Sequence, residues 1–138
     1  MREITHQGLV LARHVPAAEA WSHDATAGLR FFSADADFIQ AGTWGYAAGK
    51  ELLAHSHNEV HRDVAWTQEL LYVRKGRLRA RIYAPDDSLL ATLEASEGDL
   101  LMLLRGGHGY DILEDGTQVL EVKNGPYLGP DVDRRRLA

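Results

Sequence analysis

Short apolar segments separated by turn signals run along the chain from residue 38 onward. Residues 77–84 alternate charged and apolar side chains, and a period of two is typical of a β-strand with one buried face. Turn-forming residues follow at 85–88, 97–99, 105–107, 115–116 and 124–126. Short strands at such regular spacing are typical of a sandwich or barrel. The pattern therefore predicts an all-β, antiparallel domain.

The individual segments predict where the strands lie. We expect strands within 38–48, 51–57, 69–75, 77–84, 88–95, 100–104, 108–114 and 117–123. One helical segment of at most two turns is expected at 17–23, after Pro16, because proline is favoured at a helix start. The 138 residues are expected to form a single domain, with a core at about 38–124, N-terminal strands or an arm at 1–37 and a tail at 125–138.

Composition narrows the functional classes. A hydrophobic fraction of 45% and a charged fraction of 25% are ordinary for a globular protein. The chain has no cysteine, which excludes disulfides, thiolate ligands and cysteine nucleophiles. A net charge of −5 argues against a nucleic-acid partner, and the apolar run near the N-terminus is too short for a signal core or a membrane span. We expect a cytoplasmic protein that binds neither nucleic acid nor membranes.

Two histidines carry the first chemical signal. His55 and His57 lie two residues apart in the predicted strand 51–57, and residues at this spacing project from the same face of a strand. Their imidazoles can therefore reach one metal ion together. The pair alone is weak evidence, because a histidine in a β-barrel is more often a hydrogen-bonded core or rim residue.

The residues around this pair form a more specific pattern. Gly49 precedes His55 by six positions, and Glu69 begins the next predicted strand, seven residues before Gly76. A second group comprises Gly98, the apolar segment 100–104 and the run Gly106-Gly107-His108. Over roughly residues 38–129 the sequence resembles the cupin superfamily, and in particular small single-domain bacterial cupins.

The resemblance implies a double-stranded β-helix, or jelly-roll barrel, with a metal site at its mouth. His55, His57, Glu69 and His108 stand at the positions of the family's metal ligands. The ion would be one divalent transition metal among Fe, Mn, Ni, Co, Cu and Zn, because a site without thiolates does not select among them. Residues that would orient these ligands or line the pocket are Thr67, Gln68, Tyr46 and Tyr110.

The sequence departs from the family pattern in both motifs, and in the second one Leu104 replaces a common proline and Ile112 a late asparagine. Eleven residues separate His57 from Glu69, as an inserted loop would, so the carboxylate ligand is either Glu69 or Glu59. His61 also sits where the motif normally has its acid. His108 comes one position early relative to Gly106 in the second motif.

Three functions remain open. The first is a metal-dependent isomerase, lyase or dioxygenase acting on a small oxygenated metabolite. The second is a non-catalytic module that binds or senses a small molecule such as a sugar. The third is a metal-free carbohydrate epimerase, in which His55 or His57 would be the base and Tyr110 the acid. We also expect a homodimer, because open barrels leave edge strands that a second copy can cover.

Overall fold

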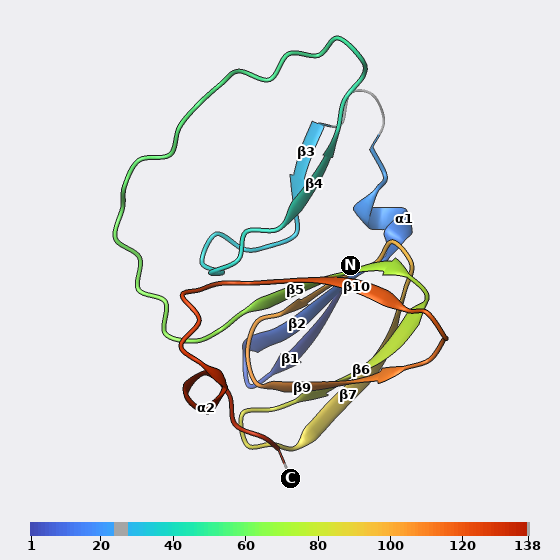
Figure 1. Ribbon diagram of the computed structural model, residues 1–138, viewed down its shortest axis with the longest axis vertical. Coiled ribbons are helices and arrows are strands. Elements are labelled where there is room, and N and C mark those ends of the chain that lie inside the picture. The colour runs from blue at the N-terminus through green and yellow to red at the C-terminus, as the bar shows by residue number, and fades with distance from the viewer. Residues whose placement is uncertain (24–27, 138) are drawn as a thin grey trace.

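The computed structural model describes residues 1–23 and 28–137, which form mainly antiparallel β-sheets (Figure 1). The largest sheet has the strand order β1-β2-β8-β5-β10, with bounds Arg2–His6, Leu9–Val15, Leu100–Leu103, Glu69–Lys75 and Gln118–Lys123. The second sheet has the order β7-β6-β9, with bounds Leu89–Ser96, Arg77–Tyr83 and Gly107–Ile112. A separate hairpin pairs β3 with β4, at Gly28–Phe31 and Gly42–Gly45. The two helices, α1 and α2, are single turns at Ala17–Ala20 and Pro130–Asp133.

Most of the predicted elements are confirmed. Strands β5, β6, β8 and β10 fall within four of the six segments expected between residues 69 and 123, and α1 falls within the helix expected at 17–23. β7 and β9 each extend one residue beyond the expected segment, to Ser96 and to Gly107. In β6, Leu78, Ala80 and Ile82 are buried. The arginines at the alternating positions of β6 point outward, where Arg79 meets Glu94 at 2.9 Å. The period of two therefore identified both the strand and its buried face.

The main core lies between the two larger sheets. It is formed by apolar side chains of both: Ile4, Leu11, Leu71, Val73, Leu78, Ala80, Ile82, Leu93, Leu101 and Leu103. A second cluster lies around Leu100, Met102 and Leu104, and includes Ala20 of α1 together with Phe32 and Ala41. Strand β8 contributes to both clusters, because all four of its residues are buried. Strand β2 packs between β1 and β8, so residues before position 38 form an integral part of the main sheet.

The strands of the described residues do not close into a barrel. β10 and β9 lie at the ends of their sheets, and each has a neighbour on one side only. Between β4 and β5 the chain leaves the sheets as a long exposed excursion (Figure 1). Residues 47–66, which we call the outer segment, are all exposed and contain no strand.

Two strand predictions are corrected by this arrangement. No strand forms at 51–57, and only Gly42–Gly45 of the expected strand 38–48 is extended and paired. An apolar run such as Leu52-Leu53-Ala54 has strand character, but a strand exists only where a neighbouring backbone satisfies its hydrogen bonds. The outer segment has no such neighbour within the described part of the chain. No helix among residues 1–23 and 28–137 is long and apolar enough to cross a membrane.

Candidate functional site

Glu69 and His108 meet at one end of the two larger sheets. Glu69 is the first residue of β5, and His108 is the second residue of β9 in the opposite sheet. The distance between His108 Nε2 and Glu69 Oε2 is 3.2 Å, and only 12% of the Glu69 side chain is exposed. The fold therefore joins two of the four predicted ligands, which lie far apart in the sequence.

Gly106 allows β9 to begin at the position that this contact requires. Its φ of +76° is unfavourable for residues with a side chain, and a Cβ at this position would lie 2.3 Å from the carbonyl oxygen of Tyr83. The chain therefore turns tightly past the end of β6 before it enters β9. His108 follows two residues later, directly opposite Ile82 in the strand pairing.

Lys123 is a further residue of this site, and the sequence analysis missed it. It ends β10 directly opposite Glu69, with Nζ 3.6 Å from Glu69 Oε1 and 3.0 Å from Glu121 Oε1. The hydrogen bond from His108 lowers the pKa of Glu69, since it outweighs the opposing effect of burial, and the charge of Lys123 acts in the same direction. Glu69 is therefore held as a carboxylate. Only the register of the β5–β10 pairing, which places Lys123 opposite Glu69, could have identified this residue.

Tyr110 lies beside this group. It is two residues after His108 on the same strand, and the two ring centroids are 5.4 Å apart. Its hydroxyl oxygen is buried and has no hydrogen-bond partner among the residues that the structure describes. Burial raises the pKa of Tyr110, and the carboxylates of Glu69 and Glu121 raise it further. The hydroxyl is thus a protonated, unused donor next to the Glu69–His108 pair.

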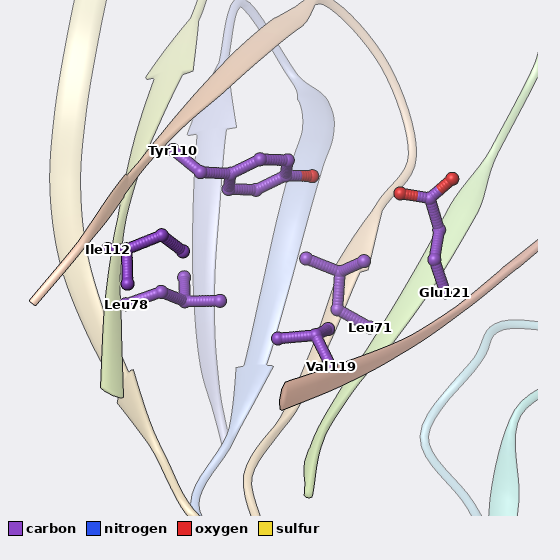
Figure 2. A pocket seen from close by; sticks show the side chains of 6 residues that line it. All are labelled: Leu71, Leu78, Tyr110, Ile112, Val119 and Glu121. Atoms are coloured by element: carbon purple, nitrogen blue, oxygen red, sulfur yellow. The ribbon is translucent and has the colours of Figure 1, made fainter. Parts of the chain in front are cut away.

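Below these polar groups the two sheets are separated by a largely apolar cavity. Its volume is about 180 Å³, and Figure 2 shows the side chains that line it: Leu71, Leu78, Tyr110, Ile112, Val119 and Glu121. The hydroxyl of Tyr110 points across the cavity toward the side on which Leu71 and Glu121 lie (Figure 2). The candidate site therefore combines a charged rim with an apolar floor.

The other two predicted ligands lie elsewhere. His55 and His57 are both in the exposed outer segment, where their ring centroids are 5.2 Å apart. Glu59 and His61 belong to the same segment, and His61 meets Asp63 at 3.0 Å. Among the described residues, no three His, Cys, Asp or Glu side chains are grouped to hold a metal ion. The structure thus brings together Glu69 and His108, and does not bring His55 and His57 to them.

The residues expected to support the ligands have structural contacts. Gln68 is 3% exposed, and its Oε1 accepts hydrogen bonds from the backbone N–H groups of Phe38 and Ile39, at 2.8 and 3.1 Å. Thr67 Oγ1 donates to Asp133 Oδ1 of α2 at 2.8 Å. These contacts anchor the chain immediately before Glu69.

Tyr46 lies on the β3–β4 hairpin rather than beside Glu69 and His108 in this structure. Its ring packs against Trp44 in a tilted arrangement, with 5.8 Å between centroids, and it lies against Gly28. Tyr46 therefore packs as part of the hairpin and not with the Glu69–His108 pair.

Replacing Tyr110 with phenylalanine tests whether its hydroxyl serves the fold. A buried hydroxyl without a partner costs free energy, so we expect Tyr110→Phe to raise the free energy of unfolding by about 1 kcal/mol. Urea denaturation followed by circular dichroism measures the change. A loss of stability would instead indicate that the hydroxyl makes a structural hydrogen bond.

Comparisons with known proteins found no relative of this chain. No protein-family model matches the chain, and no curated protein sequence or solved structure matches it significantly.

Proposed function

We propose that the protein is a cupin-type barrel that binds one divalent transition-metal ion through His55, His57, Glu69 and His108, and uses it to hold or transform a small oxygenated metabolite. The observation that carries this proposal is the contact between Glu69 and His108. Two predicted ligands from separate motifs and opposite sheets lie 3.2 Å apart at the same end of the fold. Imidazole and carboxylate donors suit a divalent transition metal.

The proposal requires the outer segment to move onto the open side of the sheets. The unpaired edge of β9, which carries His108, is available for residues 51–57 to add as a strand. Pairing would provide the neighbouring backbone that these residues lack, and would place His55 and His57 on one face. Leu53 would share that face and reach the apolar cavity. Its side chain is 82% exposed in the open arrangement, so burial would be favourable.

The charges at the rim are compatible with a cation. Glu69 is already a carboxylate, because its pKa is lowered. Lys123 occupies part of the space near Glu69, but its side chain is 37% exposed and also reaches Glu121. A metal ion at Glu69 would displace the ammonium group toward Glu121. If coordination positions on such an ion stayed open, the ion would polarise a carbonyl group or lower the pKa of a water molecule bound there.

Metal content of purified, untagged protein tests the ligand set. We expect about one equivalent of metal in the wild type, and a loss of most of it in His57→Ala and Glu69→Gln, because each change removes a donor. Glu59→Gln is the matched control, since it changes a neighbouring acid that the proposal leaves out of the site. Inductively coupled plasma mass spectrometry measures all four proteins.

The outcomes separate the alternatives for the acid and for the site. Loss of metal in Glu59→Gln but not in Glu69→Gln would assign the carboxylate to Glu59. Wild-type stoichiometry in His57→Ala would contradict the proposed site. Circular dichroism of each variant confirms that the fold is retained.

A second candidate is metal-free acid–base catalysis, and the surroundings of His108 favour it specifically. Glu69 orients the imidazole of His108 at 3.2 Å, as a carboxylate does for a histidine base, and the unused hydroxyl of Tyr110 lies nearby. This arrangement makes His108 the base, whereas the sequence pointed to His55 or His57. Absence of metal from active protein, with activity lost in both His108→Gln and Tyr110→Phe, would establish this candidate in place of the first.

A further inference from the structure

The cavity between the two larger sheets has room for one substituted six-membered ring. Its volume is about 180 Å³, whereas an engineered apolar cavity of roughly 150 Å³ binds benzene. The apolar part of its lining comes from both sheets, with Leu71 and Val119 on one side and Leu78 and Ile112 on the other (Figure 2). Such a lining favours a compact molecule with a mostly apolar surface.

The hydroxyl of Tyr110 is the group in this cavity that needs a partner. Its oxygen is buried and makes no hydrogen bond to any residue that the structure describes. Glu121, the other polar residue of the lining, is paired with Lys123 at 3.0 Å. A buried donor without an acceptor is unfavourable. A molecule that fills the cavity and presents an acceptor oxygen to Tyr110 would remove this cost.

The outer segment does not supply this acceptor. It is exposed in the arrangement described, and in the proposed closure Leu53 would bring a side chain that has no acceptor atom. The backbone carbonyl groups of residues 51–57, added to β9 as a strand, would point within the plane of the sheet toward neighbouring strands. The partner of the Tyr110 hydroxyl therefore has to come from a separate molecule.

We infer that the cavity binds a small, mostly apolar molecule with one ring and a carbonyl oxygen, which accepts a hydrogen bond from Tyr110. A carbonyl accepts this bond without bringing a donor of its own that the apolar lining would leave unpaired. A sugar fits poorly, because it carries a hydroxyl group on nearly every carbon, whereas the lining offers two polar side chains. Each hydroxyl buried without a partner lowers affinity roughly tenfold or more.

This inference names the substrate class of the proposed function, and rests on that function only for the reaction that follows binding. Tyr110 and His108 are two residues apart on β9 and share one of its faces. The carbonyl group of the bound molecule would therefore lie on the side of the cavity where His108 meets Glu69. Binding itself does not require a metal ion.

Methyl-detected NMR titration of chelator-treated protein with acetophenone tests the ligand class. We expect the methyl signals of Leu71, Leu78 and Val119 to shift, and Tyr110→Phe to weaken acetophenone binding about tenfold, because it removes the hydrogen bond. α-Methylstyrene has the same shape, with a CH₂ group in place of the carbonyl oxygen. Its affinity should change by less than about twofold in Tyr110→Phe. Equal weakening of both probes, or no shift of the cavity methyl signals in the wild type, would overturn the inference.

A matched pair of variants on β10 locates the binding. Val119 lines the cavity, whereas Leu120 is the next residue of the strand and faces the other side of the sheet. We expect Val119→Phe to weaken acetophenone binding at least about tenfold, because the added ring occupies the space of the ligand. Leu120→Phe should change it less than about twofold. Equal effects of the two variants would contradict binding in this cavity. Circular dichroism verifies that each variant is folded.

Two further measurements separate the inference from its alternatives. Glucose that shifts the cavity methyl signals at the same concentration as acetophenone would indicate a sugar site and overturn the inference. Leu53→Ala should leave these signals and the acetophenone affinity unchanged; shifted signals with tighter binding would mean that Leu53 fills the cavity in place of a ligand. Purified protein without metal would contradict the proposed metal site and would leave these binding results intact.

Discussion

Leu101→Ala is expected to lower the free energy of unfolding by about 3 to 4 kcal/mol, because truncating a fully buried leucine loses transfer energy and leaves a cavity. Leu101 is 0% exposed and lies on β8, at the centre of the five-stranded sheet. It pairs with His14 of β2 on one side and with Leu71 of β5 on the other. Strands on both sides limit how far the structure can relax into the space. The melting temperature should fall on the order of 10 °C.

Leu53→Ala is the matched control for this change. The same atoms are removed from a side chain that is 82% exposed on the outer segment. In chelator-treated protein, in which we expect the outer segment to stay exposed, the effect on stability should stay within about 0.5 kcal/mol. Thermal and urea denaturation compare the two variants. A similar loss in both under these conditions would mean that residues 51–57 are buried in solution without a metal ion.

The second large effect is expected at Asp99, whose carboxylate joins three parts of the fold. One oxygen accepts a hydrogen bond from the backbone N–H of Ala17 at 2.7 Å. The other lies 2.8 Å from His14 Nε2 and 3.0 Å from the backbone nitrogen of Ser96. Asp99→Ala removes all three acceptor contacts in a largely buried place, so we expect a loss of about 3 kcal/mol of unfolding free energy.

Two further variants decide whether this loss comes from the hydrogen bonds. Asp99→Asn keeps one acceptor oxygen and should lose less stability than Asp99→Ala. Glu97→Ala changes an exposed carboxylate two residues away and should stay within about 0.5 kcal/mol of the wild type. Urea denaturation at a fixed pH measures each variant. A loss in Glu97→Ala equal to that in Asp99→Ala would point to a general charge effect instead.

The contact between Glu69 and His108 shows how far the sequence could define the candidate site. The resemblance to the two cupin motifs implied both residues as ligands, and in the fold they lie 3.2 Å apart. Lys123 was missed because its proximity depends on the register of β10 against β5, which no local pattern reveals. His55 and His57 remain predicted ligands whose approach to Glu69 depends on a movement of the outer segment.

The sequence by itself determined the all-β class, the positions of β5 to β10 and the buried face of β6. These features follow from the alternation of charged and apolar side chains and from the turn-forming residues. Both signals depend only on residues that are close together in the sequence. Only the tertiary structure decided which edges are unpaired, which strand is buried on both faces and that residues 51–57 form no strand. Strand pairing joins residues far apart in the chain, so an apolar segment becomes a strand only where another backbone lies beside it.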